Sequence, residues 1–285
     1  MATNRYPHVE FSAEDIASLQ PAMKVGILGT VNPQGLPHLT LISTLMASTP
    51  RQVAWGQFME GSSKDYVRAN PKTGFLIMTL DRNVWRGKAH FVRTTRAGAE
   101  YDFYNNSPLF RYNAYFGIHT VYQMDLVAHS GRQPLPMNRV VAAAVQTVLA
   151  RHLPGRRRQE AVMNRWTRGF YNKLDNLKFI GYTGEDGYPV IIPLIQAQAL
   201  DRQRLIFSLG AFGDELLQIP PSTRVAVFGM SLTMEDVLVR GCFQGLRRFG
   251  GIRCGMIEVD WVYNPMPPKP MQIYPPLEVT PVREF

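Results

Sequence analysis

Hydrophobic and polar positions alternate in short runs along most of the chain. The runs are rich in β-branched and aromatic residues and are bounded by Gly, Pro, Asn and Ser, which is the pattern of strands between turns. It predicts a first set of strands over residues 25–31, 39–46, 53–57, 75–80, 85–94 and 120–128. A second set is predicted over residues 179–183, 190–199, 205–209, 224–229, 237–246 and 255–262. Many short strands at steady intervals indicate closed or sandwiched antiparallel sheet.

The hydrophobic period changes between the two sets of strands. Over residues 137–170 apolar residues recur at helical spacing, with a break at Pro154-Gly155, so we expect two helices joining the two sheets. Two shorter helices are predicted by their caps. One starts after Ser12, and the other starts after Ser62 and ends at Asn70-Pro71.

The two sets of strands share a pattern of turn residues. The segment Lys24–Pro37 returns as Lys178–Pro189, with Gly35 and Gly187 separated by 187 − 35 = 152 residues. Arg86-Gly87 matches Arg240-Gly241 at 241 − 87 = 154, and Asp125 matches Asp260 at 260 − 125 = 135. The spacing shrinks by 154 − 135 = 19, which predicts an insertion in the first copy at about residues 101–119. We therefore expect a first domain over residues 1–135, a helical connection over 136–176, and a second, degenerate domain with a proline-rich arm over 177–285.

The predicted insertion is rich in aromatic residues. Two interpretations stay open: the rings form a small satellite core, or they form a lid that offers flat contact area to a planar ligand. The residues concerned are Tyr101, Phe103, Tyr104, Phe110, Tyr112, Tyr115 and Phe116.

Composition narrows the class of protein. The 285 residues contain 45% hydrophobic and 19% charged residues, as in folded proteins, and no apolar run approaches a membrane span or a signal peptide. The net charge of +9 is partly concentrated around residues 151–168, which we interpret as a solvated helical face, because no nucleic-acid-binding module accompanies it. Two cysteines, Cys242 and Cys254, suit a reducing cytoplasm.

One short motif points to anion binding. Ser62-Ser63-Lys64 offers two hydroxyl donors and an ammonium at a predicted helix start, where backbone N–H groups are also free. The corresponding part of the second copy holds Asp214 and Glu215, which would repel a phosphate dianion. We therefore expect the first copy to carry the site. The sequence shows no catalytic triad, metal-ligand cluster or Gly-rich dinucleotide loop, so no catalytic residue is assigned.

The order of these motifs resembles the pyridoxamine 5′-phosphate oxidase-like family of FMN-binding split barrels. The resemblance covers about residues 20–130 well and 176–265 more loosely. It implies a mainly β (α+β) fold of two tandem FMN-binding-type split β-barrels joined by a helical segment. It also implies that one strand lies along the flavin, that the next strand end approaches the ribityl chain or phosphate, and that Ser-X-Lys binds the phosphate. The residues so implied are Thr40, Leu41, Ile42, Ser43, Thr44, Gln57, Phe58, Ser62, Ser63, Lys64 and Asn83.

The resemblance predicts a flavoprotein, and the departures from it restrict the reaction. Thr40 and Leu45 stand where pyridoxamine phosphate oxidase has Arg and Lys, which argues against the vitamin B6 reaction. We expect an FMN-dependent oxidoreductase acting on a small molecule, with neither nucleic acid nor membrane as partner. Two assemblies stay open: a homodimer, as the resemblance implies, or a single chain in which the second copy replaces the partner. The alternatives are a non-enzymatic flavin carrier or sensor, and a haem-binding split barrel with His90, His119 or His129 as ligand.

Overall fold

The computed structural model describes residues 5–20, 23–57, 61–108, 117–152, 161–266 and 270–277. The chain forms two compact units. The first comprises Met1–Pro136 together with Gly181–Ile191, and the second comprises Met137–Ile180 together with Ile192–Phe285. The predicted domain limits themselves stay predictions.

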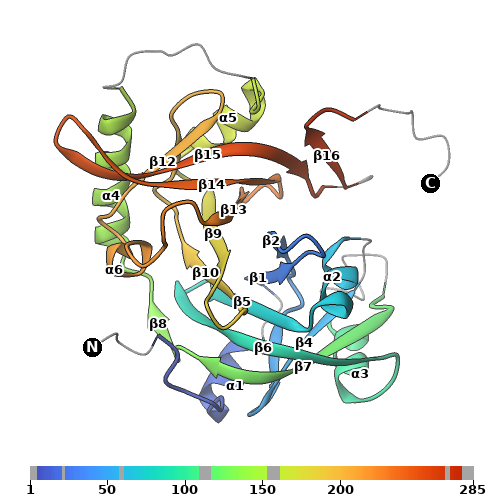
Figure 1. Cartoon of the computed structure of the whole chain (residues 1–285). Helices are drawn as coiled ribbons and strands as arrows, with labels where there is room; N and C mark the ends of the chain where they lie inside the picture. The colour runs from blue at the N-terminus through green and yellow to red at the C-terminus, as the bar shows by residue number, and fades with distance from the viewer. Residues whose placement is uncertain are drawn as a thin grey trace. The chain divides into compact units, whose positions relative to one another are not determined.

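The first unit is built on one antiparallel sheet (Figure 1). Its strands follow the order β2-β1-β5-β6-β7-β4-β3, and β8 pairs with β6. The elements are α1 (Ala13–Leu19), β1 (Lys24–Val31), β2 (Pro37–Leu41), β3 (Met46–Thr49), β4 (Gln52–Gln57), α2 (Ser63–Ala69), β5 (Lys72–Thr79), β6 (Asn83–Thr95), α3 (Ala99–Asn106), β7 (Thr120–His129) and β8 (Gln133–Pro134).

One hydrophobic core lies inside this sheet. Leu28 of β1, Trp55 of β4 and Trp85 of β6 belong to the same buried cluster, together with Phe75 and Tyr122. Strands near both ends of the sheet order therefore face a common interior, as in a barrel. Each such side chain contributes about 1.5–3 kcal/mol by its burial.

Helix α1 starts where the sequence predicts a cap. The Ser12 hydroxyl accepts from the Asp15 N–H at 3.1 Å, and the Asp15 carboxylate accepts from the Ser12 N–H at 3.1 Å. The other carboxylate oxygen of Asp15 accepts from the indole N–H of Trp85 at 2.7 Å, which ties the helix to β6. This reciprocal pair is a capping box.

The predicted single strand over residues 39–46 was wrong. Strand β2 ends at Leu41, and β3 begins at Met46 after a tight turn in which the Leu45 N–H donates to the Ile42 carbonyl at 3.1 Å. The Ile42 N–H donates to the Gly26 carbonyl at 2.7 Å, and a Cβ on Gly26 would lie 2.3 Å from the Ile42 carbonyl oxygen. The turn packs against β1, and it holds Ser43 and Thr44 but no Gly, Pro or Asn to mark it in the sequence.

A second sheet repeats the strand order of the first, and its residues Gly181–Ile191, at the ends of β9 and β10, belong to the first compact unit. The order is β10-β9-β13-β14-β15-β12-β11, with β16 paired to β15. The predicted strand over residues 190–199 is likewise interrupted, by a turn in which the Leu194 N–H donates to the Lys178 carbonyl at 2.7 Å. The elements are α4 (Met137–His152), α5 (Arg165–Asn172), β9 (Leu177–Thr183), β10 (Pro189–Pro193), β11 (Gln198–Ala199), β12 (Arg204–Ser208), α6 (Gly213–Leu216), β13 (Arg224–Met230), β14 (Asp236–Phe249), β15 (Ile252–Asn264) and β16 (Met271–Tyr274).

The predicted fold class is confirmed: a mainly β chain with two antiparallel sheets and a helical segment, α4 and α5, between them in sequence. Helix α3 lies in the predicted insertion between β6 and β7, whereas Gly250 and Gly251 join β14 to β15 directly with positive φ angles of 53° and 86°.

Part of the proline-rich arm forms β16, where Gln272 accepts from the Trp261 indole N–H at 2.6 Å. Among the described residues, no helix has the length and apolar character to cross a membrane.

The Arg-Gly pair that recurs in the sequence has a structural cause. A Cβ on Gly87 would lie 2.4 Å from the Ala128 carbonyl oxygen, and a Cβ on Gly241 would lie 2.1 Å from the Glu258 carbonyl oxygen. Gly241 stands at a register shift between β14 and β15, and Gly87 lies one residue before a shift between β6 and β7. The recurrence therefore reflects close backbone approach and does not mark a ligand site.

Candidate functional site

Strand β2 and helix α2 bring part of the predicted site together. The hydroxyl oxygens of Thr40 and Ser63 lie 2.5 Å apart, although the residues are 23 positions apart in sequence. Ser63 is 3% exposed, and Thr40 is half-buried at the strand end. Only one of the two hydroxyl protons is needed for this bond, so the pair keeps one proton to donate to a ligand.

Ser62 and Lys64 flank Ser63 at the start of α2. Both are half-buried, and the Ser62 side chain makes no capping hydrogen bond. Asp65 is the acid in this first turn, and its side chain is exposed. It follows buried Ser63 by two residues, which corresponds to a rotation of about 200° around the helix axis. The helix therefore presents hydroxyls beside Thr40 and turns its acid toward solvent.

Sequence reasoning missed a second cation on this helix. Arg68 lies four residues after Lys64, on the same helix face. Its guanidinium donates to the Tyr122 hydroxyl at 3.4 Å, and Tyr122 donates in turn to Gln57 Oε1 at 3.1 Å. Gln57 is thereby linked to α2 through Tyr122. The i, i+4 spacing from Lys64 is the signal that could have identified Arg68.

The remaining predicted residues of the β2 segment have different surroundings. Leu41, Ile42 and Ser43 are half-buried, at the end of β2 and in the turn that follows. Thr44 is buried, and its hydroxyl donates to the Gly56 carbonyl at 2.9 Å while accepting from the Gly56 N–H at 3.0 Å. The Thr44 hydroxyl is therefore fully used inside the barrel. Phe58 lies outside the described residues.

Asn83 is not brought to this group. It stands at the start of β6, beside the turn that follows β5, and its side-chain amide donates to the Asp81 carboxylate. Its backbone carbonyl accepts from the Thr79 hydroxyl at 3.3 Å. The described contacts of Asn83 thus belong to the β5–β6 turn.

The described part of the aromatic insertion forms a satellite core. Tyr104 is buried with Met46, Ala54, Ile118 and Val121, and its hydroxyl donates to the Thr44 carbonyl at 2.8 Å. Burial raises the pKa of Tyr104 well above its ordinary value. Tyr101 packs against the same cluster, while Phe103 is 41% exposed. Four further rings, those of Phe110, Tyr112, Tyr115 and Phe116, lie outside the described residues.

Two buried histidines of the first unit contact other groups of the chain. His129 Nε2 lies 2.8 Å from the Glu10 carbonyl, and the Gly131 N–H donates to Nδ1 at 3.1 Å, so both ring nitrogens are engaged. Burial lowers the pKa of His129, which favours the neutral ring. His38 is 3% exposed and packs edge-on against the Tyr66 ring at 5.2 Å. Within the described ranges, no three His, Cys, Asp or Glu side chains are grouped as metal ligands.

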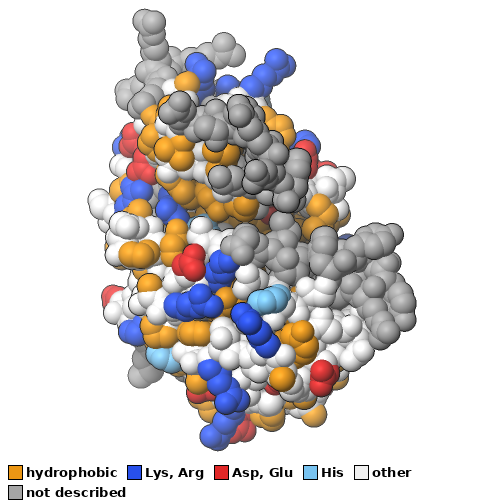
Figure 2. All heavy atoms as spheres, turned by 90° about the vertical axis from the view of Figure 1, so that its right-hand side faces the viewer, with side chains coloured by type: hydrophobic (Ala, Val, Ile, Leu, Met, Phe, Trp, Pro, Cys, Tyr) orange, Lys and Arg blue, Asp and Glu red, His pale blue; other side chains and the backbone are white. Residues whose placement is uncertain are grey.

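The second unit lacks the same donors. The turn after β2 donates a backbone hydrogen bond to the Gly26 carbonyl, and the turn after β10 donates one to the Lys178 carbonyl. These two acceptors are 178 − 26 = 152 residues apart, and the same offset makes Ile192 the counterpart of Thr40. Ile192 is buried and apolar, and α6 carries Asp214 and Glu215. On the face of the first unit turned to the viewer, Figure 2 shows Lys and Arg side chains gathered around a His. Helix α6 thus carries two acids in the segment that corresponds to the start of α2, where Lys64 stands.

Comparison with known proteins gives no family model that matches and no curated relative. Similar solved structures include HupZ of Group A Streptococcus, with 11% identity and a TM-score of 0.34 over 42% of this chain and 91% of that protein. An FMN-binding protein of Syntrophomonas wolfei has 14% identity and a TM-score of 0.34, over 41% and 82%. An F420 reductase has 15% identity and a TM-score of 0.34, over 42% and 98%. Similarity at these values does not assign a function to this chain.

Proposed function

We propose that the first unit binds FMN and that the protein is a flavin-dependent oxidoreductase acting on a small molecule. The observation that carries this proposal is the contact between Thr40 and Ser63, whose hydroxyl oxygens lie 2.5 Å apart. It brings the strand that is expected to follow the flavin next to the Ser62-Ser63-Lys64 segment.

The donor set fits a phosphate monoester. Thr40, Ser62 and Ser63 supply hydroxyls, and Lys64 supplies an ammonium, which together satisfy several oxygens of a dianion. Arg68 adds a second positive charge one helical turn further along. The exposed acid of the first turn, Asp65, lies on another side of the helix, so it does not cancel this charge.

Bound FMN would supply the hydride and electron transfer chemistry. The chain's own residues bind and orient it: the Ser-X-Lys segment holds the phosphate, and half-buried Leu41 and Ile42 offer apolar contact beside β2. Thr44 and Tyr104 fix the turn that follows, since the Tyr104 hydroxyl donates to the Thr44 carbonyl at 2.8 Å. A homodimer and a small-molecule substrate remain part of the proposal.

The phosphate assignment is tested by fluorescence titration with FMN and with riboflavin, which lacks the phosphate. Replacing Lys64 by Glu removes one charge-assisted contact, worth about 1.5–3 kcal/mol, and adds repulsion. We expect at least a tenfold loss of FMN affinity, equivalent to about 1.4 kcal/mol, with riboflavin affinity unchanged. Lys173→Glu, at an exposed lysine of the second unit that pairs with Glu235 at 3.7 Å, is the matched control. Equal FMN affinity in wild type and Lys64→Glu would refute the assignment.

Activity is tested separately. Reduction of the bound flavin by NADH or NADPH, followed as loss of absorbance near ~450 nm, would identify an oxidoreductase. FMN binding without reduction by either donor would favour a flavin carrier or sensor. A Soret band near ~400 nm in the purified protein would replace the flavin proposal with a haem one.

A further inference from the structure

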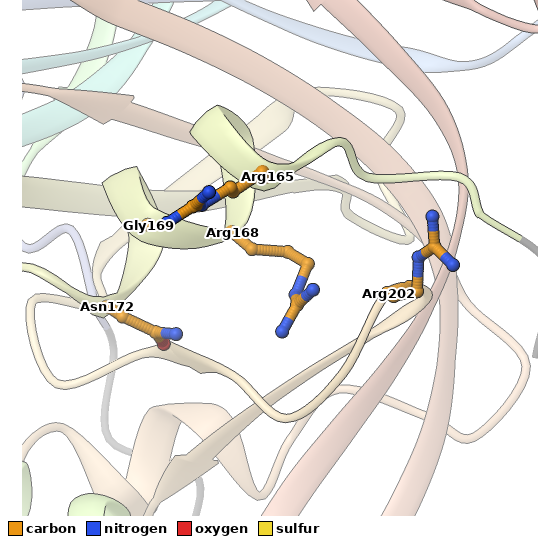
Figure 3. A pocket seen from close by; sticks show the side chains of 5 residues that line it. All are labelled: Arg165, Arg168, Gly169, Asn172 and Arg202. Atoms are coloured by element: carbon orange, nitrogen blue, oxygen red, sulfur yellow. The ribbon is translucent and has the colours of Figure 1, made fainter.

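The second unit contains a cavity of about 480 Å³ lined by basic side chains. Arg165, Arg168, Gly169 and Asn172 come from α5, and Arg202 comes from the turn between β11 and β12 (Figure 3). Figure 3 shows the Arg168 side chain extending between Asn172 and Arg202. The volume falls within the range of sites for small molecules, about 300–1,000 Å³.

The three guanidiniums have no acidic partner among the described residues. The acid adjacent to Arg202, Asp201, is already engaged: Arg204 Nε donates to its carboxylate at 2.7 Å, and the Gln203 N–H donates to it at 2.9 Å. Arg168 is the most enclosed of the three, and its Nε is buried without a hydrogen-bond partner. A buried donor without a partner destabilises the folded state by about 1–3 kcal/mol, and a bound ligand that accepted from this Nε would remove that cost.

Asn172 adds a further donor to the lining. Its amide oxygen accepts from the Ala199 N–H at 2.9 Å, which fixes the orientation of the amide. The amide NH2 group is then the part left for a ligand. The side chains that line the cavity therefore offer N–H donors, and the one oxygen among them is already occupied.

The fold does not require these arginines, as the first unit shows. The Phe11 N–H donates to the Pro50 carbonyl at 2.8 Å, and the Met163 N–H donates to the Arg202 carbonyl at 2.8 Å. These equivalent bonds are related by 163 − 11 = 152 and 202 − 50 = 152. The same offset makes Ala13, Ile16 and Pro50 the counterparts of Arg165, Arg168 and Arg202.

The uncharged counterparts fulfil the structural role of these positions. Ile16 packs against the hydrophobic core of the first unit. Helices α1 and α5 have the same kind of N-cap, since the Ser12 hydroxyl accepts from Asp15 N–H at 3.1 Å and the Asn164 side chain accepts from Thr167 N–H at 2.8 Å. The capped helix therefore forms with or without the basic residues.

We propose that this cavity binds the phosphate group of a small phosphate ester or diphosphate. Guanidinium groups match phosphate oxygens in pairs, and three of them can surround a tetrahedral dianion or a diphosphate. The site lies on α5 of the second unit and is independent of the FMN proposal, which concerns β2 and α2 of the first.

The proposal is tested by isothermal titration calorimetry with inorganic pyrophosphate at constant ionic strength. Arg202→Gln, on an exposed turn, should weaken pyrophosphate binding at least tenfold, and Arg168→Gln should weaken it further. Arg247→Gln, at an exposed arginine of β14 that does not line the cavity, is the matched control and should leave binding unchanged. Circular dichroism of each variant checks folding, and the result for Arg202→Gln decides if Arg168→Gln misfolds.

Other probes separate this site from alternatives. Lys64→Glu should leave intact the pyrophosphate binding that Arg202→Gln weakens, because Lys64 belongs to the first unit; loss of that binding in Lys64→Glu would place the anion at the proposed FMN site and overturn the proposal. Citrate that binds as tightly as pyrophosphate would overturn the phosphate assignment in favour of carboxylates. Equal affinity in wild type, Arg202→Gln and Arg247→Gln, or no detectable binding, would also overturn it.

Discussion

Replacing Lys178 by Met should change how the stability of the protein depends on pH. Lys178 lies in β9 with 0% of its surface exposed. Its Nζ donates to the Lys173 carbonyl at 2.7 Å and to the Ile195 carbonyl at 3.2 Å. Burial disfavours the charged form and lowers the pKa of Lys178 from 10.5 to about 7, against a smaller opposing effect of Asp175.

The sign of the effect follows from proton binding. Between pH 7 and 10.5 the unfolded chain holds a proton on Lys178 that the folded chain releases, so stability rises with pH across this window. The stability gained by deprotonating Lys178 is fully present above the unfolded pKa of 10.5 and is lost as pH falls through about 7. The slope is at most about 1.4 kcal/mol per pH unit, which gives about 2–3 kcal/mol between pH 7.5 and 9.5.

Urea unfolding of wild type and Lys178→Met over this pH range measures the effect. Lys24, whose pKa burial lowers to about 8, and Cys254, whose pKa burial raises to about 11, titrate in both proteins, so the difference between the two curves isolates Lys178. Lys173→Met, at an exposed lysine, is the control. If the wild-type and Lys178→Met curves run parallel within about 0.5 kcal/mol, Lys178 does not titrate as described.

Two further substitutions test the packing of the first barrel. Gly87→Ala should lower the free energy of unfolding by about 1–3 kcal/mol, because its Cβ would lie 2.4 Å from the Ala128 carbonyl oxygen. Gly61→Ala, with no atom within 4 Å of its Cβ, is the control. Equal urea midpoints for the two variants would contradict the prediction. Tyr104→Phe should cost about 1 kcal/mol by removing the buried hydrogen bond to the Thr44 carbonyl at 2.8 Å, and an unchanged thermal midpoint would count against it.

The strand pattern predicted the fold because most strands have ends marked by turn residues. The turn that follows Leu41 escaped prediction because its residues pack against β1, where the Ile42 N–H reaches the Gly26 carbonyl at 2.7 Å. Its two polar residues, Ser43 and Thr44, stand between apolar ones, and no Gly, Pro or Asn signals the turn. The turn after Pro193 in the second unit was missed although Pro193 itself argues against an unbroken strand.

Aligning the two copies by matching residue types gave a different pairing from the one that the backbone hydrogen bonds show. The sequence pairs Lys24 with Lys178, but hydrogen bonding from the turns makes Gly26 the counterpart of Lys178. The carbonyls of Gly26 and Lys178 accept equivalent bonds of 2.7 Å from Ile42 and Leu194. Positions in the two copies therefore correspond when their backbone groups make the same hydrogen bonds. By this criterion Lys178 occupies the position that glycine occupies in the first copy.

Parts of the candidate sites were predictable only where they are local in sequence. Ser62, Ser63 and Lys64 are adjacent, and Arg68 is within one helical turn of them, so a helical reading could include all four. Arg202 is 202 − 168 = 34 residues from Arg168 and reaches the cavity only through the β11–β12 turn. No local pattern connects the two, and only the folded chain does.

The contrast between Ile16 and Arg168 explains why the second-unit arginines matter more than the net charge of the chain. An exposed arginine such as Arg247 keeps its hydration, so it adds charge at little cost to folding. Arg168 instead holds a buried Nε without a partner, at a position where the first unit gains stability by burying Ile16. Since the same backbone tolerates the apolar residue, the destabilising choice needs a compensating gain, and an anion that accepts from the three guanidiniums supplies one.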